Sequence, residues 1–215
     1  MRISQSEDTY LAHCAMLSLA NIAQNDDLLY LYHDKEIDCV GLVCLTLRHA
    51  YDEEIQALCI KLIGLACVED EWGETVCAKF EMQQTLLDKI NPTTGYKLQA
   101  AAIQALAQVL VGLDKYESAM LKIQTSDGQK AIDVLLSGLD HEALVVNVKT
   151  AFAIAELADH EGLRTAFHTG SHVSTIKKLM KLASRDNRNA QFEACRALSI
   201  LGHPKPYCYC LKICF

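Results

Sequence analysis

The sequence lacks the segments that would direct a protein into or across a membrane. Its N-terminus, MRISQSEDTY, contains no apolar run of the kind that a signal peptide needs. The longest apolar windows, such as Val40 to Leu47, are too short to span a bilayer. No Asn-x-Ser/Thr glycosylation acceptor occurs. We therefore expect an intracellular protein with no membrane partner.

Positive charge is also scarce. The chain of 215 residues has 20 Lys and Arg against 27 Asp and Glu, a formal net charge of −7. Nucleic-acid binding needs a concentrated basic face that neutralises phosphates, so the charge balance argues against a nucleic-acid partner. The densest basic group comprises Lys177, Lys178, Lys181, Arg185 and Arg188.

Motifs for catalysis or for a cofactor are absent as well. The isolated glycines form no phosphate-binding loop, and no Ser, Cys or His constellation suggests a nucleophile. His168 and His172 are four residues apart, which on one helix would suit a metal, but Gly170 lies between them at a predicted helix break. We expect no catalytic residue, no cofactor and no metal site, and hence a non-enzymatic protein.

Cysteine, in contrast, is plentiful, with ten residues. Most lie in apolar helical stripes, where a thiol behaves as a small buried hydrophobe, whereas disulfide frameworks are typical of short secreted chains. This usage favours a reducing compartment, namely the cytoplasm, with the nucleus as the alternative. The stripe members are Cys14, Cys39, Cys44, Cys59, Cys67 and Cys195.

The main positive feature of the sequence is a helical segment that occurs five times. The second residues of the copies are Ala12, Gln56, Gln99, Asn147 and Gln191, so the intervals are 44, 43, 48 and 44 residues. A period in the forties built from helices predicts stacked helical repeats rather than a closed globular core. The copies are Leu11–Ala23, Ile55–Cys67, Leu98–Leu110, Val146–Ala158 and Ala190–Gly202.

Each repeat is predicted to contain a short, a medium and a long helix, and the five copies are the long third helices. Asp52 is expected to cap the third helix that follows it, and Thr94 the next one. The first and second helices are predicted over 27–32 and 36–48, 116–123 and 131–139, and 161–168 and 173–183.

The apolar residues of these helices predict which faces are buried. Small or aliphatic residues at positions five, eight, nine and twelve of the third helices would let neighbouring third helices approach closely. Examples are Cys59, Leu62, Ile63 and Ala66, Ala102, Ala105, Leu106 and Val109, and Ala194, Ala197, Leu198 and Leu201. In the fifth repeat, Met180 is expected on the apolar face of the second helix and Phe192 on that of the third.

The fifth repeat carries the most specific pattern. It combines the turn glycine Gly170 with the third helix Ala190-Gln-x-x-Ala-x-x-Ala-Leu-x-Ile-Leu-Gly202. This pattern resembles the armadillo repeat over roughly residues 10–203, whereas HEAT repeats, the nearest rival, have two helices each. The resemblance implies an all-α fold, a right-handed α-solenoid of three-helix repeats.

The resemblance also implies a domain organisation. Residues 1–203 form about 4.5 repeats, with boundaries at 1–24 (partial), 25–68, 69–111, 112–159 and 160–203, and residues 204–215 form an irregular Cys-rich tail. His203 and the tail cysteines match no standard zinc spacing. Neither end has the polar outer face of a terminal repeat. We expect a fragment or isoform of a longer array, either monomeric or end-capped by more repeats of a longer chain.

In armadillo proteins, positions seven and eleven of the third helices face a concave groove that binds an extended peptide or a partner domain. Importin-α-like members carry tryptophan and asparagine there, but Trp72 lies outside the third helices and only Asn21 matches. The basic groove of β-catenin-like members is not reproduced either. The implied groove residues are Leu17, Asn21, Lys61, Leu65, Gln104, Gln108, Phe152, Glu156 and Arg196, of which Phe152 and Leu65 are the best candidates for a contact.

The sequence therefore favours a non-enzymatic scaffold that binds a protein or peptide of unknown identity along this groove. Two other hypotheses stay open. One is a regulatory adaptor for a small GTPase or a client-binding, chaperone-like module. The other is the non-catalytic part of a larger enzyme.

Overall fold

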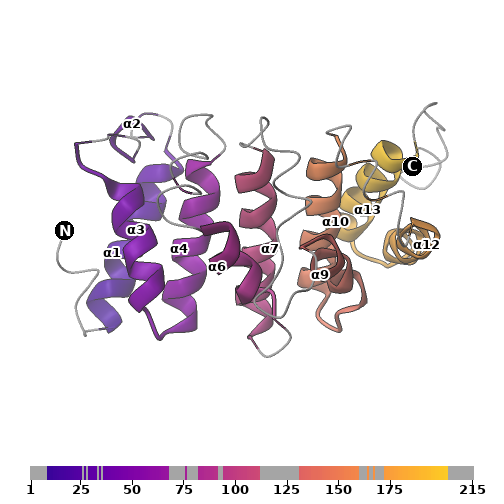
Figure 1. Ribbon diagram of the computed structural model, residues 1–215, viewed down its shortest axis with the longest axis horizontal. Coiled ribbons are helices and arrows are strands. Elements are labelled where there is room, and N and C mark those ends of the chain that lie inside the picture. The colour runs from indigo at the N-terminus through magenta and orange to yellow at the C-terminus, as the bar shows by residue number, and fades with distance from the viewer. Residues whose placement is uncertain are drawn as a thin grey trace. The chain divides into compact units, whose positions relative to one another are not determined.

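The computed structural model describes residues 9–25, 27, 29–32, 34, 36–67, 76, 82–91, 94–111, 131–159, 164, 167 and 172–202. The chain divides into two compact units, unit 1 (Met1–Lys115) and unit 2 (Tyr116–Phe215), which are taken separately below. Every regular element within the described residues is a helix (Figure 1). None of these helices is both long and apolar enough to cross a bilayer.

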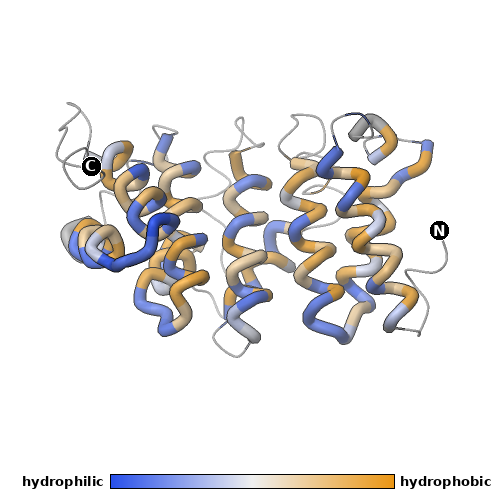
Figure 2. Tube along the Cα trace, turned by 180° about the vertical axis from the view of Figure 1, so that it is seen from behind, coloured by the Kyte–Doolittle hydropathy of each residue, from blue (hydrophilic) through white to orange (hydrophobic). Residues whose placement is uncertain are grey.

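The five predicted third helices are all present. In unit 1, α1 (Thr9–Ala23) packs against α4 (Glu53–Ala66), and α4 packs against α7 (Tyr96–Val111). In unit 2, α10 (Leu144–Ala158) packs against α13 (Arg188–Leu201). Each helix begins about two residues before the predicted copy. The predicted positions of the five third helices are therefore confirmed. Hydrophobic and hydrophilic stretches alternate along these helices (Figure 2).

The shorter helices cover one side of the third helices. In unit 1, α3 (Cys39–His49) packs on α4 and α6 (Met82–Lys89) packs on α7, while α2 (Leu29–Tyr32) contacts α1. In unit 2 the corresponding elements are α9 (Ala131–Ser137), the 3-10 turn η3 (Gly138–Asp140), which packs on α10, and α12 (His172–Ala183), which packs on α13. The predicted first helices over 116–123 and most of 161–168 lie outside the described residues.

Burial confirms the predicted register in α4, α7 and α10 but not in α1, where Ser18 at position eight is exposed and only Leu19 at position nine is buried. In α4, α7 and α10, the residues at positions five, eight, nine and twelve are all buried. Small side chains dominate these positions, for example Ala102 and Ala105 in α7, and small side chains let helix axes approach closely. In α13 one of the four differs, because Leu198 is only half-buried.

Two apolar residues lie on the opposite side of their helices from the prediction. Phe192 is 64% exposed and Met180 is 60% exposed, although both were expected on a buried face. The buried residues of α13 are instead the small ones, such as Ala194 and Ala197, together with Leu201. Two faces of α13 have apolar residues at helical spacing, and the face with the small residues is the one that packs against neighbouring helices.

The helix starts follow side-chain capping. Asp52 caps α4 as predicted, since its carboxylate accepts from the backbone N–H groups of Glu54 and Ile55 at 2.9 and 3.0 Å. The prediction for Thr94 is wrong, because its hydroxyl donates to the carbonyls of Lys89 and Asn91 at 2.8 Å instead of capping α7. Asparagine caps α13, where Asn187 accepts from the N–H of Ala190 at 3.0 Å.

The start of α3 is three residues later than predicted. Asp38 adopts a left-handed conformation (φ 48°) and accepts from the N–H of Gly41 at 3.1 Å. Left-handed backbone cannot continue a right-handed helix, so Asp38 ends the preceding turn and begins α3. Gly41 leaves room for this cap, because an added Cβ there would lie 2.4 Å from the Asp38 carboxylate and would displace it.

A side-chain amide closes the turn before each third helix from α4 onward. We call these residues the amide latch: Gln56, Gln99, Asn147 and Gln191, each at position two of its predicted copy and therefore the fourth residue of its helix. The latch N–H groups donate to backbone carbonyls of the preceding turn, some of which also accept a backbone N–H, as Gly138 does from His141. The acceptors are Ala50 for Gln56, Asn91 and Thr94 for Gln99, Gly138, Leu139 and His141 for Asn147, and Arg185 for Gln191.

The core of unit 1 contains an aromatic residue surrounded by thiols. Tyr32 is fully buried and its hydroxyl donates to the carbonyl of Leu62 at 2.9 Å. Burial raises the pKa of Tyr32 well above its ordinary value, and nearby cysteines add to the effect. Burial, with a smaller effect of Cys44, also raises the pKa of Cys59 to about 12. Its thiol lies 3.6 Å from the sulfur of Met16 on α1.

This burial predicts selective thiol chemistry. A thiolate is the reactive form of cysteine, so Cys59 is expected to stay unmodified by iodoacetamide at pH 8 in the native chain and to react fully in urea. The half-buried Cys195 serves as the internal control and is expected to react before Cys59. The unfolded thiol ionises near pH 9 and the folded one near 12, so stability from this group is complete below pH 9 and falls toward pH 12. Peptide mass spectrometry measures the modification, and native alkylation of Cys59 at the rate of Cys195 would contradict the prediction.

Candidate binding surface

Six of the predicted groove residues lie on the third helices of unit 1. In α1, Leu17 is 42% exposed and Asn21 is exposed. In α4, Lys61 is exposed and Leu65 is half-buried. In α7, both Gln104 and Gln108 are half-buried. Because α4 packs against both α1 and α7, three neighbouring helices each contribute two of the predicted groove residues in unit 1.

The two glutamines of α7 offer hydrogen-bonding groups. Gln104 and Gln108 stand one helical turn apart, and neither side-chain amide has a hydrogen-bond partner among the described residues. Gln108 lies over Gly64 of α4, because a Cβ added to Gly64 would meet Gln108 Oε1 at 2.3 Å and Ala105 Cα at 3.1 Å. Glycine at this position therefore lets α4 and α7 approach and gives the Gln108 side chain its place.

The other three predicted residues come together in unit 2. Phe152 and Glu156 stand on consecutive turns of α10, and Arg196 reaches them from α13. The Arg196 guanidinium lies 5.4 Å from the centroid of the Phe152 ring, and the Lys149 ammonium lies 5.8 Å from it. These are cation–π distances. Phe152 is half-buried, so it is neither an ordinary core residue nor an isolated surface aromatic.

Acidic residues fix the guanidinium over the ring. Arg196 forms an ion pair with Glu156 and a second, at 3.4 Å, with Glu193 one turn earlier on α13. Burial raises the pKa of Glu193 above the ordinary carboxyl value, and the Lys149 ammonium partly offsets this rise. A face with Lys149, Glu156, Glu193 and Arg196 is balanced in charge, and its apolar element is the edge of Phe152.

Solved structures resemble the chain over most of its length. Two engineered proteins match with TM-scores of 0.72 and 0.73 at 21% and 22% identity, each over 93% of this chain and 78% and 76% of theirs. A computationally designed armadillo repeat protein, described as made for modular peptide recognition, matches with a TM-score of 0.64 at 17% identity. That match covers 93% of this chain and 79% of the designed protein. The chain has the armadillo-repeat fold. No protein-family model and no curated protein matched the sequence.

The structure shows a role for the amide latch that the sequence analysis did not predict. Gln56, Gln99, Asn147 and Gln191 marked the register of the repeats, but their role in closing the preceding turn was missed. A polar residue at a fixed position in an otherwise apolar helix was the available signal, because a buried amide must find partners. In the first repeat Ala12 occupies this position and supplies no such bond.

Metal-binding candidates can be compared with the structure only in part. The described residues contain no group of three or more His, Cys, Asp and Glu side chains placed to hold a metal ion. His168, the side chain of His172 and the tail from His203 onward lie outside what the structure describes. The expectation that the chain has no metal site stays a prediction.

Proposed function

We propose that this armadillo-fold chain is a non-enzymatic scaffold that binds a partner protein or an extended peptide on its third-helix surface. The observation that carries the proposal is the pair of unpartnered amides, Gln104 and Gln108, on a helix packed beside the exposed Lys61. Half-buried amides keep access to solvent, so a bound chain can replace their water with direct hydrogen bonds. The backbone of an extended peptide supplies both donors and acceptors at such a surface.

The surface of unit 1 also offers apolar contact. Leu17 and Leu65 lie on α1 and α4, on either side of Lys61 in the chain, and both keep part of their side chain accessible. Apolar anchors flanked by polar groups are typical of binding surfaces. The designed armadillo protein that matches this chain is described as recognising peptides, and this supports the proposal by analogy of fold.

The residues of unit 2 suit a different contact. Lys149 and Arg196 both lie over the ring of Phe152, so the ring is positioned before a partner arrives, which lowers the entropy cost of binding. We include Phe152, Glu156 and Arg196 in the proposed binding surface. The nearly neutral charge of this face favours a partner segment that is neither strongly acidic nor strongly basic.

The compartment belongs to the same proposal. None of the cysteines in the described ranges forms a disulfide, which is what a reducing cytoplasm or nucleus maintains. A cytoplasmic scaffold, with the nucleus as the alternative, is the location we propose.

Selection from a displayed library of random 12-residue peptides tests the surface. Peptides that bind the wild-type chain are expected to bind the double variant Gln104→Ala and Gln108→Ala about tenfold or more weakly, because two amide hydrogen bonds are lost at about 0.5–1.5 kcal/mol each. Isothermal titration calorimetry measures the affinities, and circular dichroism confirms that both proteins are folded.

The matched control removes two glutamine amides elsewhere. Gln24 follows α1 and Gln84 lies on α6, outside the third-helix surface, so the double variant Gln24→Ala and Gln84→Ala is expected to bind as the wild type does. Selected peptides that lose affinity equally for both double variants, or for neither, would refute the proposed surface.

A further inference from the structure

The latch Gln56 in unit 1 and the latch Asn147 in unit 2 differ in the bonding of their side-chain oxygen. In unit 1, Lys89 donates to the side-chain oxygen of Gln56 at 3.1 Å. Lys89 stands ten residues before the latch Gln99, and Lys181 stands ten residues before the latch Gln191, so Lys181 is the counterpart of Lys89. The counterpart of Gln56 is Asn147, which is one methylene shorter. Its side-chain oxygen is buried and has no hydrogen-bond partner among the described residues.

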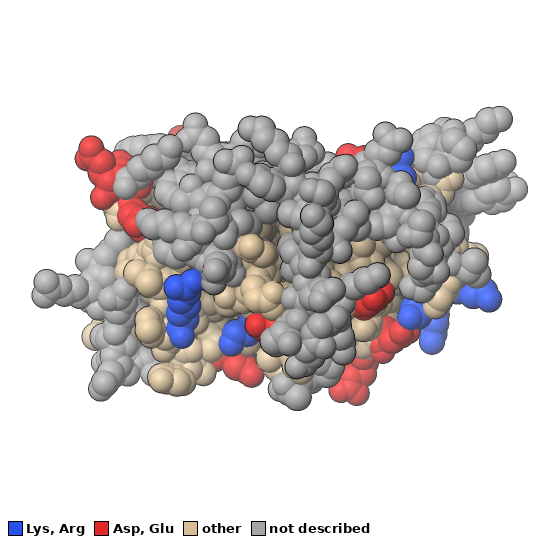
Figure 3. Space-filling model, in the orientation of Figure 1, with Lys and Arg blue, Asp and Glu red and all other residues tan. Residues whose placement is uncertain are grey.

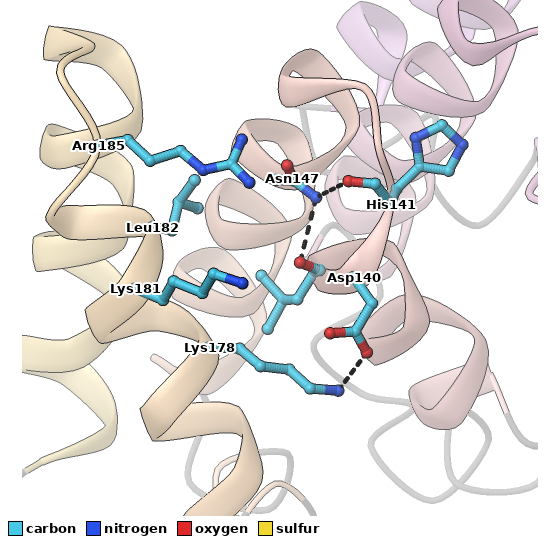
Figure 4. Close-up of a pocket in the computed structure, with 8 residues that line it drawn as sticks. Asp140, His141, Asn147, Lys178, Lys181, Leu182 and Arg185 are labelled. Atoms are coloured by element: carbon cyan, nitrogen blue, oxygen red, sulfur yellow. Dashed lines mark hydrogen bonds and ion pairs between the residues drawn. The ribbon is translucent and has the colours of Figure 1, made fainter.

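A cavity of about 100 Å³ lies where unit 1 has this bond. It is several times larger than the roughly 10–15 Å³ that one water molecule needs. Asn147 lines it from α10, and Lys178, Lys181 and Arg185 line it from α12 and the turn that follows (Figure 4). Three carbonyl acceptors fix the nitrogen of the Asn147 amide, so its oxygen faces the other way, on the side of Arg185 (Figure 4).

The cavity carries an excess of positive charge on an acidic chain. Lys178 is paired with Asp140 at 2.5 Å. Lys181 and Arg185 have no acidic partner among the described residues. Basic and acidic side chains are both seen among the described residues of unit 2 (Figure 3). Lys181 and Arg185 belong to the densest basic group in the sequence.

We propose that this cavity binds a phosphate monoester on a partner peptide, that is, a phosphorylated serine or threonine. A phosphate monoester carries a charge of about −1.5 to −2 at pH 7, which matches Lys181 and Arg185, whereas a carboxylate would leave one cation uncompensated. Arginine binds phosphate through two parallel N–H bonds, and lysine adds a point charge.

Asn147 positions the arginine in this arrangement. A guanidinium has five N–H donors, so Arg185 satisfies the buried oxygen of Asn147 with one and presents others to the phosphate. The shorter latch side chain has two effects: it leaves Lys181 available to the ligand, and it provides the acceptor that holds Arg185. This site is separate from the third-helix surface proposed above and does not depend on it.

Fluorescence anisotropy with the full chain tests the site. The probe is the fluorescein-labelled peptide Gly-Gly-Ala-pSer-Ala-Gly-Gly, compared with the same peptide carrying Ser or Glu in place of phosphoserine. We expect saturable binding of the phosphopeptide, binding at least about tenfold weaker for the Glu peptide, and none for the Ser peptide. Inorganic phosphate is expected to compete. Saturable binding of the Glu peptide with equal affinity, or no saturable binding of the phosphopeptide, would overturn the proposal.

Two double variants with the same change in charge separate a built site from general attraction. Lys181→Gln with Arg185→Gln is expected to weaken phosphopeptide binding about tenfold or more. Lys177→Gln with Arg188→Gln removes two exposed cations that do not line the cavity and is expected to change it less than about threefold, a screened surface effect. Equal losses in both double variants would overturn the proposal.

The single variant Asn147→Gln gives unit 2 the latch residue that unit 1 has at Gln56. Its longer side chain is expected to accept from Lys181, as Gln56 does from Lys89, and to weaken phosphopeptide binding about fivefold or more while the chain stays folded by circular dichroism. Affinity unchanged in a folded Asn147→Gln chain would contradict the role given to Asn147. The surface double variants keep the site testable whatever the stability of this variant.

Discussion

Replacing Leu106 by alanine is expected to lower the free energy of unfolding by about 2–5 kcal/mol. Leu106 occupies position nine of α7 and is fully buried in unit 1. The substitution removes three side-chain carbons from a packed interior, so the loss combines the transfer free energy with the cost of the cavity that remains. Urea unfolding followed by far-ultraviolet circular dichroism measures the change.

The control for this substitution lies in the same unit. Leu45 of α3 is 39% exposed, so Leu45→Ala is expected to cost well under half as much, because less apolar area is returned to water. In unit 2, Leu198→Ala is likewise expected to cost less than Leu106→Ala, since Leu198 is only half-buried. A change at Leu106 of less than about 0.5 kcal/mol, the usual range of surface substitutions, would mean that the register assigned to α7 is wrong.

The second large effect is expected at the amide latch. Asn147 is 1% exposed and its nitrogen is within 2.8–3.1 Å of three carbonyl oxygens. Asn147→Leu keeps the approximate size of the side chain and removes its N–H donors. The carbonyls of Leu139 and His141 then lose this donor at about 1–3 kcal/mol each, while the carbonyl of Gly138 keeps the backbone N–H of His141. We expect the unfolding free energy of unit 2 to fall by about 3 kcal/mol, measured by chemical denaturation.

The same substitution at Gln191 provides the comparison. Gln191 makes a single bond, to the carbonyl of Arg185 at 3.0 Å, in an exposed turn where water can replace it. Gln191→Leu is therefore expected to change stability by less than about 1 kcal/mol. Equal losses of unfolding free energy in Asn147→Leu and Gln191→Leu would contradict the prediction, because they would show that the loss does not depend on buried carbonyls losing their hydrogen-bond donor.

The sequence was sufficient to place the third helices because their buried positions carry small or aliphatic residues at one fixed register. It was insufficient where two faces of a helix are both apolar. Phe192 and Met180 fit the helical period equally well on an exposed face, and periodicity does not say which face a neighbour covers. The prediction for the start of α7 also failed because it considered only neighbouring residues. In the structure the N–H of Gly95, just before α7, donates to the side chain of Glu53 on another helix.

For the candidate surface, the sequence named positions but not their partners. The armadillo resemblance selected Phe152 and Arg196 one by one, and their assignment to a groove stays a prediction. Their stacking depends on α10 and α13 lying side by side, which a one-dimensional pattern does not specify. The pairing of Lys89 with Gln56, and its loss at Asn147, was likewise invisible, because it depends on one methylene group in a packed turn.

The amide latch has a consequence for how such a chain can be lengthened or shortened. The side-chain nitrogen of each latch donates only to the turn that directly precedes its own third helix, so the turn and the helix form one unit. Breakpoints placed in the middle of two third helices, for instance between α4 and α7, would move a complete turn and latch together. Duplication or deletion of such a segment would leave every bond of this kind intact, which makes the number of repeats an adjustable quantity in evolution and in engineering.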